Sequence, residues 1–102
     1  MFARNVTMRL KPNSVPEFTR TLENEILPML RKQTGFQDEI TFVVPGGAEA
    51  VAISLWDQKV DAETYERGTY PQVLKALAKL VEGNPRVQTY EVCNSTFHKR
   101  NR

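Results

Sequence analysis

Apolar residues recur along the first third of the chain with two different periods. Near the N-terminus they alternate with polar residues: Val6, Met8 and Leu10 share one phase, and Arg4 occupies the same phase. A period of two is typical of a strand with one buried face, so the pattern predicts a strand over residues 2–11. From residue 14 to residue 33 the spacing changes to three and four. The apolar positions of this stretch, which predict an amphipathic helix, are Phe18, Leu22, Ile26, Met29 and Leu30.

Local signals mark the two ends and the middle of this helix. Ser14 and Glu17 have the spacing of a capping box, in which each side chain accepts a hydrogen bond from the other residue's amide. Pro28 removes one backbone hydrogen bond and predicts a kink near Asn24–Glu25. Gly35 is suited to a left-handed exit from the helix.

The middle of the chain predicts a β-hairpin. Residues 36–44 and 49–57 are strand-like, and Pro45–Gly46–Gly47 between them is a turn. The first strand is expected to carry Phe36, Ile40, Phe42 and Val44 on one face. The second strand has one bulky face, formed by Val51, Ile53 and Leu55, and one face of Ala50, Ala52 and Ser54 that ends in Trp56.

The last third predicts a second helical region and a final strand. The helix begins near Asp61, is interrupted at residues 68–71, resumes over 72–82 and ends at Gly83–Asn84–Pro85, and residues 86–97 form the strand. The order β-α-β-β-α-β indicates an α+β, ferredoxin-like fold with an antiparallel sheet. Two helices cover only one face of such a sheet. The open apolar face therefore predicts a homodimer in which two sheets pack together.

Composition limits the classes of function. The chain has 102 residues and a formal net charge of +2, which suits a single domain over 1–97 followed by a basic C-terminal tail at 98–102. The body of the chain has no basic face of the kind that binds nucleic acid, so nucleic-acid binding is not expected. It also has no run of about 18 apolar residues, so no membrane span is expected. Cys93 is the single cysteine, so neither an internal disulfide nor a cysteine-based metal cluster is expected. The pattern predicts that Cys93 is a half-buried residue of the last strand. The N-terminus lacks a signal-peptide core, which predicts a cytoplasmic protein.

Two segments carry a family resemblance. Residues 51–65, VAISLWDQKVDAETY, run from a strand that ends in Trp56 to a helix that carries Tyr65, and Gly35–Phe36 leads from the first helix into a strand. Together with the pattern over residues 2–97, they resemble the antibiotic-biosynthesis-monooxygenase-like family of dimeric α+β barrels. The resemblance implies a homodimer with a small ligand between helices and sheet. Many members of that family oxidise aromatic or quinol substrates without metal or flavin.

The resemblance also bears on cofactors. The haem-degrading branch uses an asparagine on the first strand and a histidine ligand in the second helical region. Asn5 resembles that asparagine in position, although it is out of phase with Val6, Met8 and Leu10. No histidine lies between residues 61 and 85, so haem binding is not expected, and neither is any other cofactor or metal. The lone His98 belongs to the tail.

The predicted ligand site is walled by Trp56, Tyr65 and Tyr70, with Arg4 or Asn5 at its polar end. Each residue has a plainer alternative: the aromatic side chains can fill the core, and Arg4 can lie on the surface. The quinol-oxidising members often carry histidines near the break in the second helix, where this chain has none, so the catalytic residue is unassigned. Glu66, Tyr65, Tyr70 or a group from elsewhere would have to accept a proton. Asp38–Glu39 is interpreted as a solvated pair.

Three functions are consistent with this pattern. The first is a cofactor-independent monooxygenase that acts on a small aromatic or quinol-like substrate. The second is a non-enzymatic ligand-binding or stress-related dimer of the same fold. The third is a barrel that serves mainly for oligomerisation.

Overall fold

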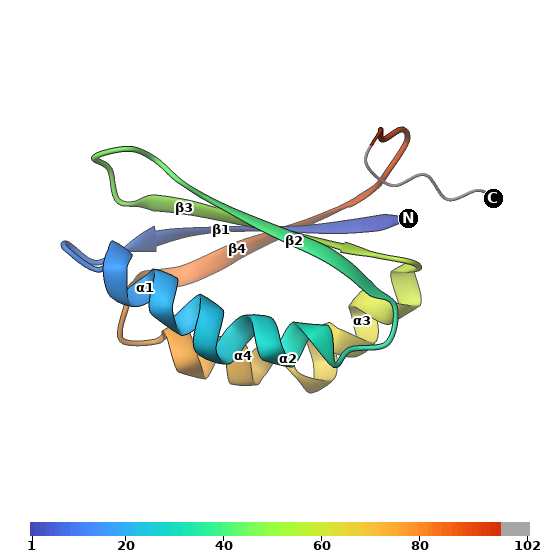
Figure 1. Ribbon diagram of the computed structural model, residues 1–102, viewed down its shortest axis with the longest axis horizontal. Coiled ribbons are helices and arrows are strands. Elements are labelled where there is room, and N and C mark those ends of the chain that lie inside the picture. Colours follow the sequence, from blue (N-terminus) through green and yellow to red (C-terminus); the bar gives the residue numbers. More distant parts are fainter. Residues whose placement is uncertain (97–102) are drawn as a thin grey trace.

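The computed structural model describes residues 1–96, which form one antiparallel sheet with helices packed on one of its faces (Figure 1). The four strands have the spatial order β2-β3-β1-β4. The elements, in chain order, are β1 (Phe2–Leu10), α1 (Val15–Thr21), η1 (Leu22–Ile26), α2 (Leu27–Arg31), β2 (Phe36–Val43), β3 (Glu49–Trp56), α3 (Lys59–Gly68), α4 (Tyr70–Leu77) and β4 (Val81–Glu91). This arrangement confirms the predicted ferredoxin-like α+β class.

The first helical segment absorbs its internal proline through a change of helix type. η1 is a π-helical turn between α1 and α2, and the amide of Leu27 bonds to the carbonyl of Leu22, five residues earlier. Pro28 follows directly and has no amide to donate. The irregularity expected near Asn24–Glu25 is therefore present as a π-helical turn.

The predicted capping box at the start of α1 is wrong. Ser14 is the N-cap residue, but its side chain makes no capping hydrogen bond. Its backbone has φ −98° and ψ −5°, in the helical region, whereas a capping side chain normally needs an extended N-cap backbone. At the other end of the helical segment, Gly35 has the predicted left-handed conformation, with φ +79°. A Cβ at that position would overlap the Asp61 carboxylate.

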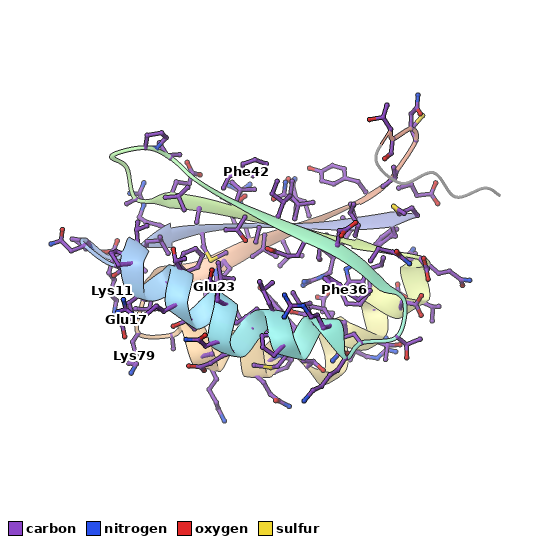
Figure 2. The ribbon with its side chains drawn as sticks, viewed as in Figure 1. Lys11, Glu17, Glu23, Phe36, Phe42 and Lys79 are labelled. Atoms are coloured by element: carbon purple, nitrogen blue, oxygen red, sulfur yellow. The ribbon has the colours of Figure 1, made fainter. Side chains whose placement is uncertain are left out.

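A β-bulge at the start of β2 overturns the predicted faces of that strand. Phe36 pairs with Trp56 and Asp38 pairs with Leu55, so Gln37 has no partner of its own. The extra residue reverses the alternation of side chains. Phe36 consequently lies on the helix side, against Trp56, whereas Phe42 projects from the opposite face (Figure 2).

The last strand also differs from the prediction. β4 begins at Val81, so Gly83–Asn84–Pro85 does not end a helix but forms an irregular, bulged segment inside the strand. The register passes from Arg9 paired with Glu82 to Thr7 paired with Arg86 across this segment. β4 ends at Glu91, and Cys93 follows it as an exposed thiol, not as the half-buried strand residue that the pattern predicted.

The two faces of β3 have the predicted composition. The face beneath the helices carries the buried side chains of Ala50, Ser54 and Trp56 and the half-buried Ala52. The other face of the sheet is uncovered. We call it the open face, and its apolar members are the exposed Ile40, Phe42, Val44 and Tyr90 with the half-buried Val51, Ile53 and Leu55.

Candidate functional site

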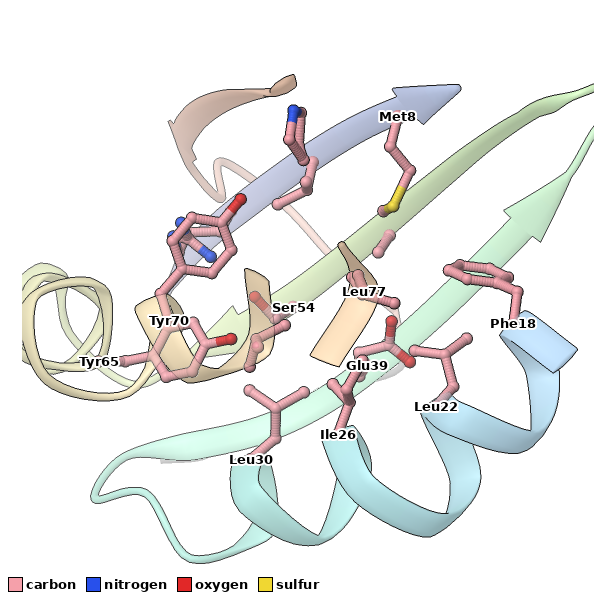
Figure 3. Close-up of a pocket in the computed structure, with 15 residues that line it drawn as sticks. Met8, Phe18, Leu22, Ile26, Leu30, Glu39, Ser54, Tyr65, Tyr70 and Leu77 are labelled. Atoms are coloured by element: carbon pink, nitrogen blue, oxygen red, sulfur yellow. The ribbon is translucent and has the colours of Figure 1, made fainter. Parts of the chain in front are cut away.

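A small cavity of about 50 Å³ lies between the sheet and the helices (Figure 3). Its polar side chains are Arg4 from β1, Glu39 from β2, Ser54 from β3, Tyr65 from α3 and Tyr70 from α4. The remaining walls are apolar and come from every layer of the fold: Val6, Met8, Phe18, Leu22, Ile26, Leu30, Ala52, Val73, Leu77 and Pro85. An apolar space with a few convergent polar groups is the usual form of a small-molecule site.

Arg4 is the most unusual side chain of the cavity. It is only 2% exposed, although it is charged. Its Nε lies 3.6 Å from Oε1 of Glu66, a half-exposed side chain, and neither Nε nor Nη2 makes a hydrogen bond within residues 1–96. Buried guanidinium groups normally have their donors satisfied, because an unpaired buried charge is costly.

Two tyrosines hold the guanidinium by their ring faces. The central carbon of Arg4 lies 4.3 Å from the ring centre of Tyr70 and 5.2 Å from that of Tyr65. Such cation–π contacts stabilise a positive charge without using its N–H donors. Nε and Nη2 of Arg4, which make no hydrogen bond within the described residues, can therefore donate to an anionic atom of a ligand.

Both tyrosine hydroxyls stay protonated at neutral pH. Burial raises the pKa of Tyr65 to about 12, against a lowering by Arg4. Burial also raises the pKa of Tyr70, and the neighbouring Arg4 again acts in the opposite direction. Neither phenol therefore supplies a negative charge to Arg4, whose one ion pair within residues 1–96 is with Glu66, and both phenols can donate a hydrogen bond.

Strand register aligns three polar residues across the sheet. Ser54 on β3 pairs with Arg4 on one side and with Glu39 on the other, so the three form a row that faces the helices. Trp56 fixes the serine: its Nε1 donates to Ser54 Oγ at 2.9 Å. The Ser54 hydroxyl thus accepts from Trp56 and can donate into the cavity. We call Glu39, Ser54 and Arg4 the polar row.

Glu39 forms the β2 end of this row. Burial raises the pKa of its carboxyl above the usual 4.5, and a hydrogen bond from Thr41 lowers it in part. Figure 3 shows the Glu39 side chain directed among Leu22, Ile26 and Leu77. A carboxyl group whose ionised form lacks full solvation is a stronger base than one on the surface.

The predicted site residues are only partly brought together. Arg4, Tyr65 and Tyr70 line the cavity as expected. Trp56 does not: it is fully buried, 5.0 Å from the ring centre of Tyr65, and packs behind the cavity wall. Asn5 is on the opposite face of β1, half-buried, because neighbouring residues of a strand point to opposite sides. His98 lies outside the described residues.

Sequence reasoning missed Glu39 and Ser54 as cavity residues. The solvated interpretation of Asp38–Glu39 depends on the lack of a histidine or cysteine neighbour, and the structure contradicts it for Glu39, which lines the cavity. A signal was present, since Ile40 and Phe42 alternate with Glu39 and Thr41. The exposed apolar phase of β2 faces outward, and this leaves the polar phase inside.

A surface groove of about 360 Å³ adjoins the cavity. It runs between α4 and the bulged part of β4, and it shares Tyr70, Leu77 and Pro85 with the cavity. These three side chains therefore form the partition between an internal space and solvent.

Two further findings concern metal sites and membrane spans within residues 1–96. Within this range, no group of three histidine, cysteine, aspartate or glutamate side chains is placed to hold a metal ion. No helix in the described part of the chain is long and apolar enough to cross a membrane.

Solved structures with the same fold confirm the expected resemblance at the level of architecture. A monooxygenase from Streptomyces coelicolor, solved with the ligand nanaomycin D, has a TM-score of 0.79 at 14% identity over 96% of this chain and 92% of that chain. A protein of unknown function from Nitrosomonas europaea has a TM-score of 0.79 at 16% identity over 97% and 95%. A protein titled antibiotic biosynthesis monooxygenase has a TM-score of 0.72 at 12% identity over 92% and 100%.

Sequence comparison adds no assignment. No protein-family model matches the chain, and no curated protein matches it significantly. At identities of 8–17%, the structural neighbours establish the fold, and any reaction has to be argued from the residues of the site.

Proposed function

We propose that this protein is a cofactor-independent monooxygenase that acts on a small aromatic or quinol-like substrate bound in the cavity as an anion. The observation that carries the proposal is Arg4, buried with two N–H donors unsatisfied. The fold supports it, since one neighbour of the same architecture is a monooxygenase solved with nanaomycin D.

An aromatic oxyanion fits the surroundings of Arg4. A guanidinium can donate two converging hydrogen bonds to one anionic oxygen, and charge-assisted bonds are roughly twice as strong as neutral ones. The rings of Tyr65 and Tyr70 and the apolar walls suit a flat apolar body. A ligand with one ionised oxygen on an aromatic frame would satisfy both parts of the cavity.

The size of the cavity requires an opening step. A space of about 50 Å³ holds water but no aromatic ring, since a benzene site needs about 150 Å³. Rotation of Tyr70 and Leu77 would join the cavity to the adjoining groove. The joined space falls in the range of small-molecule sites, about 300–1,000 Å³.

The proposed reaction uses the substrate as its own source of electrons. A ring ketone with an acidic CH₂ group loses a proton and becomes an enolate, whose oxyanion Arg4 holds. Molecular oxygen adds to the carbanion, and the resulting hydroperoxide loses water to leave a new carbonyl. The balance is R₂CH₂ + O₂ → R₂C=O + H₂O, with no external reductant. Apolar walls keep solvent from the enolate.

Oxygen uptake with anthrone and with 1,4-naphthoquinol tests the proposal. We expect wild-type protein, dialysed against a chelator, to consume oxygen and to insert one labelled oxygen atom from O₂ into the anthrone product. Arg4→Met should reduce the rate at least about a hundredfold. Arg9→Met, an exposed arginine of the same strand, is the matched control and should leave it unchanged. Equal rates in both variants would contradict the proposal.

The second candidate function is ligand binding without chemistry. It is favoured by the lack of any histidine before His98, which leaves the described chain without the most common general base. In this case Arg4 would still anchor the anion. Binding of anthrone without oxygen consumption would select this function.

We also propose that the protein is a homodimer formed through the open face. The face exposes Ile40, Phe42, Val44 and Tyr90, four large apolar side chains on one side of one sheet. A continuous apolar sheet face left in water favours association. In a dimer with a twofold axis, the open face of one copy would pack against the same face of the second copy.

A further inference from the structure

We infer that Glu39 is the base that removes a proton from the substrate, at the end of the polar row opposite Arg4. The inference rests on the proposed function, because it assumes that the cavity is the substrate site. It assigns a catalytic residue where the sequence offered Glu66, Tyr65, Tyr70 or a group from elsewhere, and it defines the substrate more narrowly.

The register of the sheet gives the geometry. Arg4 and Glu39 are each paired with Ser54, so they are two strands apart and face the same side. Strands are about 4.8 Å apart, which puts the two backbones roughly 10 Å from each other. From these two strands both side chains reach the cavity, on opposite sides of Ser54.

The order Glu39, Ser54, Arg4 along the cavity suits a substrate whose acidic hydrogen and carbonyl oxygen lie on opposite sides of a conjugated ring. The C–H bond breaks, and the proton forms an O–H bond with the Glu39 carboxylate. The electron pair moves through the conjugated ring to the carbonyl oxygen, where Arg4 binds the new oxyanion. The Ser54 hydroxyl, oriented by Trp56, lies between them and can donate to the ring system.

The alternative bases are less suited to this role. Glu66 is half-exposed and pairs with Arg4, so it lies at the end of the site where the oxyanion is held and not at the opposite end, where the C–H bond would lie. Tyr65 and Tyr70 are protonated at neutral pH, because burial raises both pKa values. Glu39 lines the cavity, lies on the far side of Ser54 from Arg4, and accepts its hydrogen bond from Thr41.

The groups around Glu39 come from every element packed against it. Arg4 faces it across Ser54, Tyr65 and Tyr70 come from α3 and α4, and Glu66 lies beyond Arg4. η1 and α2 present Leu22, Ile26 and Leu30 to the cavity, while Arg31 of α2 shares a surface groove with Glu39. Burial among these apolar side chains raises the pKa of Glu39, and the hydrogen bond from Thr41 lowers it in part.

Hydrogen–deuterium exchange of anthrone under argon tests the inference without oxygen chemistry. In D₂O, wild-type protein should speed the exchange of the CH₂ hydrogens, with a rate that rises with pH as Glu39 ionises. Glu39→Gln should bind anthrone as well as wild type and reduce the exchange rate by about 10²–10⁴-fold. Asp38→Asn removes the exposed neighbouring carboxylate of β2 and should change nothing.

Thr41→Val supplies a readout that a purely structural role would not move. The Thr41 hydrogen bond lowers the pKa of Glu39, so its loss should shift the rise of the exchange rate to higher pH. Glu39→Asp should restore part of the exchange lost in Glu39→Gln.

The outcomes separate the two proposals. Exchange that survives in Glu39→Gln, or no exchange by wild type, overturns the role of Glu39. Exchange that depends on Glu39, followed by no oxygen uptake when air is admitted, supports the base and defeats the monooxygenase. Oxygen uptake that is equal in wild type and Glu39→Gln supports the monooxygenase and defeats the base.

Discussion

Each face of the sheet departs in one feature from the usual distribution of polarity. On the face beneath the helices, a buried arginine, a buried serine and a half-buried glutamate lie in one row. The open face exposes Ile40, Phe42 and Tyr90, each at about half of its full area. Two charged residues thus lie among the apolar side chains of the helix side, while large apolar side chains are exposed on the other face.

The buried arginine on the helix side and the exposed apolar side chains on the open face have separate physical explanations. A buried, incompletely paired guanidinium is unfavourable for folding and persists where something else compensates it, such as a ligand. Exposed apolar side chains are tolerated singly, but a continuous group of them indicates an interface. One face therefore indicates a binding site, and the other indicates a protein contact.

The largest expected effect is on the open face. Phe42→Glu puts a carboxylate into the proposed interface twice, once from each copy, and desolvation costs several kcal/mol per ion. We expect sedimentation velocity to find wild-type dimer and variant monomer at micromolar concentration. Val60→Glu is the matched control, because Val60 is 54% exposed but lies on α3, away from the open face. Monomeric wild-type protein would remove the meaning given to this face.

The next effect concerns the wall behind the polar row. Trp56 is fully buried, so Trp56→Ala should lower the free energy of unfolding by about 3–5 kcal/mol in denaturant titrations. Trp56→Phe keeps an aromatic ring and removes the hydrogen bond to Ser54, and it should lose less, about 1 kcal/mol from that bond. A small loss for the alanine variant would mean that Trp56 borders open space after all.

Arg4 distinguishes a binding residue from a structural one. Arg4→Met should weaken anthrone binding at least about a hundredfold, about 2.7 kcal/mol. The same variant should leave the free energy of unfolding unchanged or raise it by about 1 kcal/mol, because an apolar side chain replaces a poorly paired buried charge. Calorimetry and denaturant unfolding measure the two quantities. A variant that loses both stability and binding would make Arg4 a structural residue.

The smallest effect is the pH dependence contributed by Glu39. Its pKa is raised in the folded state, so the carboxyl stabilises the fold below its ordinary pKa of 4.5, and this contribution is lost as pH rises through the raised value. The unfolding free energy of wild type, minus that of Glu39→Gln, should therefore fall with rising pH and then level off. Denaturant titrations at a series of pH values measure it. A difference that grows with pH would have the wrong sign.

Periodicity in the sequence was sufficient for the elements and their order. The alternation of Val6, Met8 and Leu10 predicted β1, and the small face of Ala50, Ala52 and Ser54 was found beneath the helices. Arg4 and the two tyrosines reached the cavity as proposed. These predictions depended on the periodic spacing of apolar residues, which follows directly from the backbone geometry of strands and helices.

Only the tertiary structure decided which residues meet. A single bulged residue in β2 moved Phe36 to the helix side, and strand register placed Glu39, Ser54 and Arg4 in one row. Register depends on pairing between segments far apart in the chain, and a shift of one residue exchanges the two faces. The sequence by itself determined the strands, the helices and the apolar open face, whereas the polar row exists because three strands were brought into register.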